Sequence, residues 1–158
     1  MSSDPSGFEL PLRLLLGFRV LIDDLDAELA RQGHPNVRPL HGFVFQAIGP
    51  HGTTAAELGR RLGISKQAAG KTIDALERLG YVQRGVDPRD TRRKVAHLTE
   101  RGVDCLRRSA RIFDDLRAHW ASTLGPERLR ALEADLRKMT PDVFRLDADH
   151  DGWGCERD

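Results

Sequence analysis

The sequence predicts a mainly α-helical chain with one small β-hairpin. Apolar residues recur every three or four positions near both ends of the chain, as they do along one face of a helix. Two short helical segments follow one another across a glycine in the middle, and two strand-like segments then flank a charged turn. The 158 residues suffice for one domain with its own hydrophobic core.

The first helix is predicted from about Phe8 to Arg31, after a polar N-terminal segment, residues 1–7. It ends near Gly33, and a shorter helix is expected from Pro39 to Ile48, before the next glycine and proline. The apolar stripe of the first helix consists of Leu14, Phe18, Leu21, Leu25 and Leu29.

Two short helices are expected next, joined by a tight turn. Thr54 can cap the first, and Glu57 three residues later completes a capping box. Gly63 allows the chain to bend sharply, Ile64 is expected to fill the space between the two helices, and Ser65 caps the second. The buried stripe of the second helix is predicted to be Ala69, Ile73 and Leu76.

Residues 81–86 and 94–98 are predicted to form the two strands of a hairpin, with the charged turn between them. The net charge of the chain is only +1, but it is unevenly distributed. Residues 55–110 hold 13 Lys/Arg and 7 Asp/Glu, a net of +6, whereas the remainder holds 12 and 17, a net of −5. A basic middle with acidic flanks indicates one surface that binds an anion.

Thr99 is predicted to cap a long helix that runs to about Thr123, and Pro126 opens the last helix. Residues 144–158 are predicted to be a disordered acidic tail. The tail resembles the start of a calcium-binding loop, but Asp158 stands where that loop needs a bidentate glutamate, so no metal site is predicted. The last helix carries a heptad seam of Leu129, Leu132, Leu136, Met139 and Val143.

Helix, tight turn, helix and hairpin are the elements of a winged helix-turn-helix. In this motif the second helix enters the major groove of DNA with its N-terminal residues leading. The side of that helix opposite the buried stripe is polar and basic: glutamine can bind adenine, lysine can bind guanine or phosphate, and alanine can touch a thymine methyl. The DNA-contacting residues predicted on it are Ser65, Lys66, Gln67, Ala68, Gly70 and Lys71.

The charged turn of the hairpin supplies a second set of predicted DNA contacts. Arg89, Arg92 and Arg93 would release counterions from the phosphate backbone, and arginine also suits a narrow minor groove. Asp90 is expected to orient the Arg92 guanidinium through a charge-assisted hydrogen bond. The alternative is a solvated turn whose local ion pairs contribute little.

The segments "ELGRRLGISKQAAGKTIDALERLGYVQR" (57–84) and "DPRDTRRKVAHLTERG" (87–102) resemble the MarR family of bacterial transcription regulators. The second is the more specific, because an Asp-x-x-Asp-x-Arg turn followed by Leu-Thr-x-x-Gly is close to a family signature. The resemblance extends over residues 8–143 and implies a homodimer on a pseudo-palindromic operator. It also implies that the helix from Ser65 binds the major groove and that Arg92, held by Asp90, enters the minor groove. Gly70 departs from the family, which more often has a polar side chain there.

We therefore interpret residues 8–143 as one MarR-like unit. Residues 8–38 and 124–143 are the predicted dimerisation helices, and residues 39–123 form the winged helix-turn-helix lobe with its long connecting helix. The predicted function is sequence-specific regulation of transcription, as a repressor. The alternative is a winged-helix module that binds protein without sequence-specific DNA binding. An enzyme is not expected, since no glycine-rich phosphate loop, nucleophile elbow or HExxH motif occurs.

The resemblance also implies that a small aromatic ligand could release the DNA, whereas no cofactor is expected. The alternative for the candidate residues is an ordinary core position. Redox sensing is disfavoured, because Cys105 follows Asp104 and a neighbouring carboxylate raises a thiol pKa. Neither a signal peptide nor a membrane span is expected, so the predicted compartment is the cytoplasm. The candidate ligand-binding residues are Phe18, His41, Phe43, Phe45 and Phe113.

Overall fold

A computed structural model describes residues 6–38 and 40–140 and confirms a mainly helical fold with one antiparallel hairpin. The predicted tail and Val143 lie outside the described residues. In chain order the elements are α1 (Glu9–Arg31), α2 (His41–Ile48), α3 (Ala55–Leu62), α4 (Lys66–Arg78), β1 (Val82–Asp87), β2 (Asp90–Leu98), α5 (Glu100–Leu124) and α6 (Pro126–Met139).

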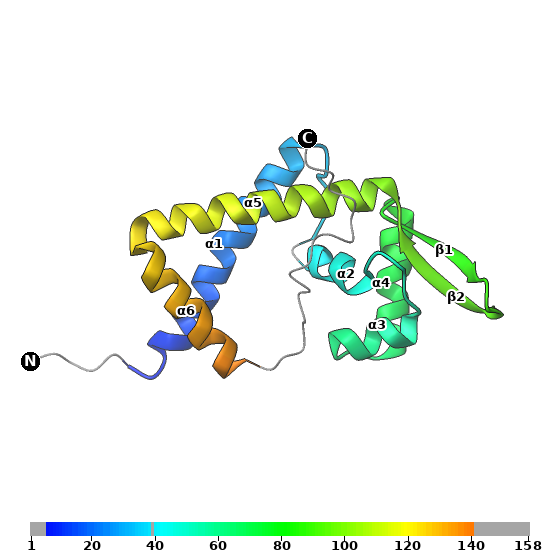
Figure 1. Cartoon of the computed structure of the whole chain (residues 1–158), viewed down its shortest axis with the longest axis horizontal. Coiled ribbons are helices and arrows are strands. Elements are labelled where there is room, and N and C mark those ends of the chain that lie inside the picture. Colours follow the sequence, from blue (N-terminus) through cyan, green and yellow to red (C-terminus); the bar gives the residue numbers. More distant parts are fainter. Residues whose placement is uncertain (1–5, 39, 141–158) are drawn as a thin grey trace, which may run out of the picture.

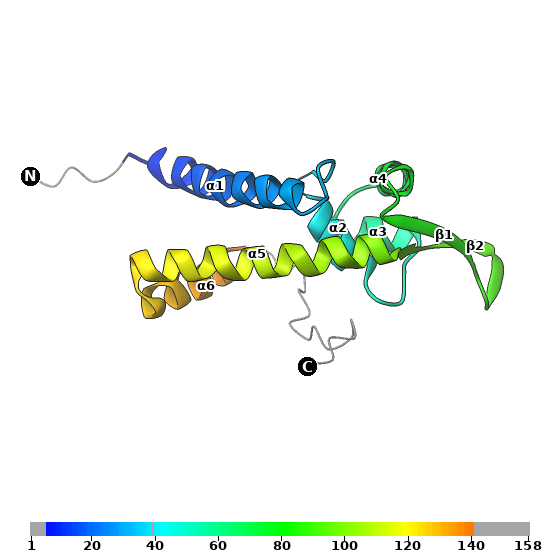
Figure 2. The same ribbon diagram turned by 90° about the horizontal axis from the view of Figure 1, so that it is seen from above.

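The long helix α5 connects two ends of the molecule, which are built from different elements (Figure 1). Helices α2, α3 and α4 and the hairpin, residues 41–98, lie at one end and are called the reading lobe below. Helix α6 and the N-terminal half of α1 lie at the other end. Both α1 and α6 pack on α5, and Figure 2 shows that they lie apart although they overlap in Figure 1.

The predicted helix caps are confirmed. The Thr54 hydroxyl accepts a hydrogen bond from the Glu57 amide at 3.2 Å, and the Ser65 hydroxyl accepts one from the Ala68 amide at 3.1 Å. Each bond satisfies one of the N–H groups that a helix start leaves without an internal partner, so α3 and α4 begin at fixed residues. The other half of the predicted capping box does not form in this way, since the Glu57 carboxylate pairs with Arg60 and Arg61.

The turn between α3 and α4 differs from the prediction in one residue. Gly63 ends α3 with the expected left-handed backbone, at φ 67°. The Ile64 side chain, however, is 41% exposed and does not fill the space between the helices. The close contact is made by backbone instead, because a Cβ on Gly59 would lie only 2.8 Å from the Ile64 carbonyl oxygen. Gly59 therefore allows the two helices to meet.

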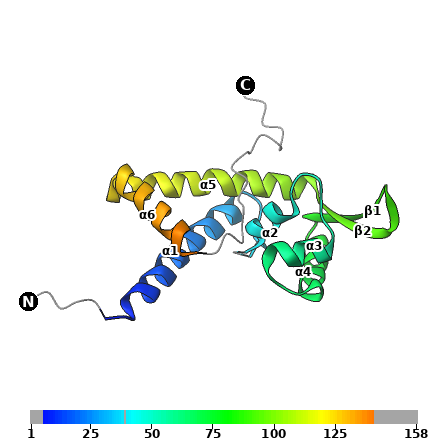
Figure 3. The ribbon, with the colours of Figure 1, turned by 60° about the horizontal axis from the view of Figure 1, so that its bottom comes forward.

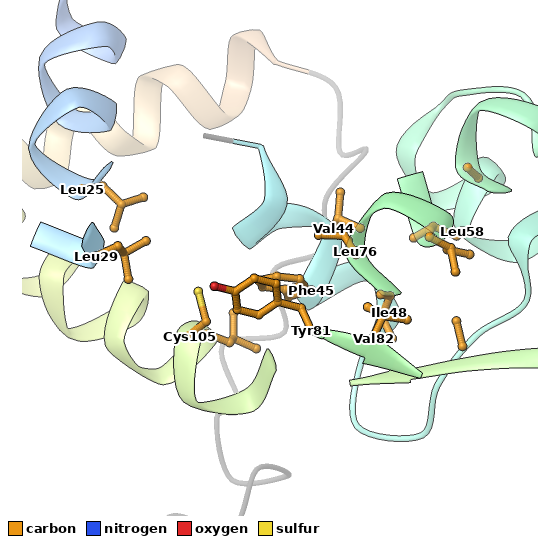
Figure 4. Close-up of a cluster of buried hydrophobic side chains, with 14 of the residues drawn as sticks. Leu25, Leu29, Val44, Phe45, Ile48, Leu58, Leu76, Tyr81, Val82 and Cys105 are labelled. Carbon is orange, nitrogen blue, oxygen red and sulfur yellow. The ribbon is translucent and has the colours of Figure 1, made fainter. Parts of the chain in front are cut away.

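One hydrophobic core holds the reading lobe to α5 and to the end of α1 (Figure 4). The Phe45 and Tyr81 side chains are fully buried and their ring centroids are 5.6 Å apart. The predicted stripe of α4 is buried in this core, as are Leu25 and Leu29 of α1. The buried residues of the stripe are Ala69, Ile73 and Leu76.

Tyr81 is the point where α4, the hairpin and α5 meet. Its amide donates to the Leu76 carbonyl at 2.9 Å, and its carbonyl accepts from the Thr99 amide at 3.0 Å. Thr99 caps α5 by accepting from the Gly102 amide at 3.2 Å, as predicted. A Cβ on Gly102 would lie 2.3 Å from the Tyr81 carbonyl oxygen, so this contact requires glycine. The Leu-Thr-x-x-Gly pattern thus has a packing reason.

Candidate nucleic-acid interface

The N-terminal part of α4 presents a polar, basic surface to solvent. Lys66, Gln67 and Lys71 are exposed, and Gln67 and Lys71 stand four residues apart on the same side of the helix. These three residues are called the reading face below. Ser65 is exposed as well, and its hydroxyl oxygen is engaged in capping α4. Ala68 is half-buried, so it is less accessible to DNA than these exposed residues.

Gly70 is half-buried, and its missing side chain is not a packing requirement. A Cβ built at this position meets no atom within 4 Å. The helix therefore presents bare backbone where a longer residue would fit, at the cost in helix stability that glycine carries. Without a side chain at this position, the α4 backbone can approach a ligand closely.

The hairpin differs from the prediction in where its arginines lie. Strands β1 and β2 pair antiparallel from Val82 opposite Leu98 to Val86 opposite Lys94. The register then shifts, so that Asp87 pairs with Asp90 and residues 91–93 form a bulge on β2. The predicted second strand thus begins at residue 90 rather than 94.

The arginines are presented by two different parts of the hairpin. Only Arg89 lies in the turn, whereas Arg92 and Arg93 lie in the bulge, and all three are exposed. The hairpin projects beyond the helices of the lobe (Figure 3). Across residues 6–38 and 40–140, no carboxylate forms a salt bridge with any of these three side chains.

Asp90 holds the backbone of Arg92 rather than its guanidinium. The Asp90 carboxylate accepts from the Arg92 amide at 3.0 Å, and Asp87 accepts in the same way from the Arg89 amide at 2.9 Å. Such local bonds are the usual role of aspartate in turns. The expected charge-assisted bond to the Arg92 side chain is therefore replaced by a backbone bond, which leaves the guanidinium available to a ligand.

Arg84 was not among the predicted site residues, and it ties the hairpin to α4. Its guanidinium pairs with Asp74, lies 3.7 Å from the Glu77 carboxylate and donates to the Gly70 carbonyl at 3.4 Å. Its amide also donates to the Glu77 carboxylate at 3.0 Å. Arg84 thus fixes the reading face relative to the hairpin. The signal in the sequence was an arginine shortly after a helix with two exposed acids.

The five predicted ligand-binding aromatics differ in how far they are exposed to solvent. Phe18 is 44% exposed on α1, and Phe113 packs partly buried against the core from α5. His41 and Phe43 are half-buried on α2, whereas Phe45 is fully buried in the core. The His41 and Phe45 rings are 6.4 Å apart, so these two do lie together. Burial lowers the pKa of His41, and the nearby Arg38 lowers it further.

Neither a thiol switch nor a membrane span is indicated by the described residues. Cys105 is buried, and that burial raises the pKa of its thiol to about 11, with Asp104 adding to the effect. Few thiolates form at neutral pH under these conditions. Within residues 6–38 and 40–140 no helix is long and apolar enough to cross a bilayer.

Comparison with known proteins agrees with this geometry. Residues 36–93 match the model of the MarR family. A stretch of 42 residues is 48% identical to the uncharacterized HTH-type transcriptional regulator YcgE of Bacillus subtilis (strain 168). That match covers 27% of this chain, and the chain spans about a quarter (27%) of the length of this curated relative.

Solved structures resemble almost the whole chain. The S. aureus MepR–DNA complex is 23% identical, with a TM-score of 0.64 over 87% of this chain and 97% of that one. Streptococcus pneumoniae FabT in complex with DNA is 17% identical, with a TM-score of 0.70 over 82% and 92%. A cysteine-to-serine mutant of E. coli MarR complexed with operator DNA is 24% identical, with a TM-score of 0.67 over 88% and 100%.

The helices, the turn and the projecting hairpin define a winged helix-turn-helix protein with long helices at both ends of the chain. Within this class, residues 36–93 are similar to the MarR family, whose model they match.

Proposed function

We propose that this protein is a sequence-specific DNA-binding transcription regulator that acts as a homodimer. The observation that carries the proposal is that two exposed basic groups lie on one lobe, one on α4 and one on the hairpin. The reading face of α4 and the arginines of the hairpin lie on the same lobe, and Arg84 joins the two elements. The similar solved structures of FabT, MepR and MarR are complexes with DNA, which supports the proposal.

Each element has a distinct role in this proposal. Helix α4 enters the major groove, where Gln67 binds a base edge and Lys66 and Lys71 bind guanine or phosphate. Arg92 enters the neighbouring minor groove or binds its phosphates, with Arg93 and Arg89 adding phosphate contacts. Asp90 shapes the bulge that carries Arg92 through the backbone bond described above.

The proposed homodimer uses the apolar surface at the other end of the molecule. In the single chain Leu14 and Phe18 of α1 are 46% and 44% exposed, and Leu132 and Leu136 of α6 are 39% and 37% exposed. Met139 is 83% exposed, and only Leu129 of the described seam is buried. An apolar surface of this kind marks an interface. A two-fold dimer presents two reading faces and therefore binds a pseudo-palindromic operator.

A repressor role and release by a small aromatic ligand complete the proposal. A dimer that covers an operator within a promoter excludes RNA polymerase. Phe18, Phe43 and Phe113 are only partly buried and His41 is held neutral near neutral pH, so an uncharged aromatic effector is the class that suits these side chains.

Fluorescence anisotropy on the duplex upstream of the gene tests the proposal, with a scrambled duplex beside it at one salt concentration. We expect tight binding to the upstream duplex alone. Arg92→Ala should weaken binding, whereas Arg130→Ala, which removes the same charge from an exposed position on α6, should not. No binding to either duplex at low salt would overturn the proposal and favour a protein-interaction module.

A further inference from the structure

A buried polar cluster lies where α1 ends. His34, three residues beyond α1, is 3% exposed. Its Nδ1 lies 3.0 Å from the Tyr81 hydroxyl, and its Nε2 lies 2.9 Å from the Asp104 carboxylate of α5. One histidine thus joins the end of α1 to α5 and to the residue at which α4, β1 and α5 meet.

The protons in this cluster can be assigned from its chemistry. An ionised carboxylate only accepts hydrogen bonds, so Nε2–H of His34 donates to Asp104. In the neutral imidazole Nδ1 is then an acceptor, and the Tyr81 hydroxyl donates to it. The Arg108 guanidinium beside Asp104 lowers the pKa of that carboxyl, with His34 adding to the effect, which agrees with this assignment. Every polar atom of the buried imidazole therefore has a partner.

A second set of bonds from α5 holds the residues next to His34. Arg108 donates to the Asp104 carboxylate at 2.8 Å and to the Gln32 side-chain oxygen at 3.0 Å. Arg101 donates to the Gly33 carbonyl at 3.1 Å, and its guanidinium lies 4.9 Å from the centroid of the Tyr81 ring. We call His34 with these partners the polar junction; its members are Gln32, Gly33, His34, Tyr81, Arg101, Asp104 and Arg108.

The polar junction separates the two ends of the molecule. On one side of it α1 carries the exposed apolar residues of the proposed dimer surface. On its other side Tyr81 bonds to the last turn of α4 and to the start of α5. Burial alone would allow α1 to slide or rotate, because the hydrophobic effect is non-directional. Directional bonds to both imidazole nitrogens set one arrangement.

We propose that His34 is a positioning residue that fixes the direction of α1 relative to the reading lobe, and thereby the separation of the two reading faces in the dimer. The expected effect of His34 on DNA binding rests on the proposed function, whereas its effect on the direction of α1 within one chain does not. His34→Leu fills the buried position with an apolar side chain and removes the hydrogen bonds to Tyr81 and Asp104. His34→Gln can donate to Asp104 and accept from Tyr81, so it should restore the arrangement.

The first test measures geometry within one chain and needs neither DNA nor a dimer. Spin labels are placed at the exposed positions Ala27→Cys on α1 and Gln83→Cys on β1, in a Cys155→Ser background, and labelled chains are diluted with unlabelled protein. The distance distribution should be narrow in the parent, broader in His34→Leu and narrow again in His34→Gln. An unchanged distribution in folded His34→Leu would overturn the inference.

The second test measures how strictly the protein requires the spacing of the half-sites. The duplex is an operator selected from random sequence by the parent protein, with one or two base pairs inserted between its half-sites. The parent should lose roughly ten-fold or more in affinity on insertion, and His34→Leu should lose much less. A purely structural loss would weaken binding to all duplexes alike, and that outcome would contradict a positioning role.

Asp104→Asn provides a variant that keeps the fold, because Asp104 is about half exposed and its side-chain shape is conserved. It should broaden the distance distribution in the same direction as His34→Leu, to a smaller degree. If the parent protein selects no DNA at all, the proposed function fails, whereas the spin-label experiment still decides whether His34 positions α1.

Discussion

The reading lobe differs in the burial of its apolar residues from the opposite end of the molecule. That end consists of α6 and the N-terminal half of α1 and is called the outer end below. In the lobe Phe45, Leu58 and Tyr81 are fully buried and the charged residues face outward. At the outer end, most of the apolar residues of α6 and of the first half of α1 are exposed. The lobe thus shares one core with α5 and the end of α1, whereas in the proposed dimer the outer end would be buried by the partner. Stability of the lobe and assembly of the dimer should respond to different substitutions.

The largest expected effect is on the core of the lobe. Phe45→Ala removes a fully buried ring that packs against Tyr81, and it should lower the free energy of unfolding by about 3–5 kcal/mol. Urea denaturation followed by circular dichroism measures this change. Phe18→Ala, on the half-exposed side of α1, is the control and should cost the lobe much less. Equal losses would contradict the division into two regions.

A charge on the α6 surface should break the dimer and spare the lobe. Leu132 and Leu136 lie four residues apart on one side of α6, and replacing both by Glu should weaken dimerisation at least about 100-fold. Sedimentation equilibrium measures the mass of each variant in solution and so distinguishes dimer from monomer. Ala131→Glu with Ala134→Glu adds the same charge on the opposite side of α6 and should leave the dimer intact. If the alanine variant became monomeric, or if the variant without Leu132 and Leu136 stayed dimeric, the interface would lie elsewhere.

Arg84 links the two DNA-contacting elements of the lobe. Arg84→Met keeps the length of the side chain and releases Asp74 and Glu77, so both acids would stand unpaired beside the reading face. We expect roughly ten-fold weaker binding to DNA, with a loss of stability below about 1 kcal/mol because the ion pairs are partly exposed. Fluorescence anisotropy measures the affinity for DNA, and urea denaturation measures the free energy of unfolding. Arg78→Met, which replaces an exposed arginine of α4, is the matched control.

The predictions that succeeded concern contacts between residues close in sequence. Thr54, Ser65 and Thr99 each bond to an amide three residues away, so the residue types and their spacing suffice to predict them. The buried stripe of α4 follows from the period of the helix. The mainly helical fold with its hairpin could be predicted for the same reason.

The features that were missed depend on pairing between distant segments. The bulge in β2 is decided by the register with β1, and the bond from His34 to Asp104 spans 70 residues. No local pattern specifies either of them. The wrong expectation for Ile64 arose because Gly59 lets two backbones meet, which makes an inserted side chain unnecessary. Asp90 was assigned to a side chain, whereas the nearer backbone amide competes successfully for its carboxylate.

The smallest expected effect concerns Gly70 and separates stability from binding. A Cβ at this position meets no atom within 4 Å, so Gly70→Ala should raise the free energy of unfolding by about 0.5–1 kcal/mol, the usual gain in a helix. Urea denaturation measures that gain. If the α4 backbone closely approaches DNA, the added methyl group should weaken binding at the same time. Ala75→Gly, a half-buried position later in α4, is the reverse control and should destabilise the helix without changing the reading face. Stabilisation with unchanged affinity would show that bare backbone at residue 70 is not needed for contact with DNA.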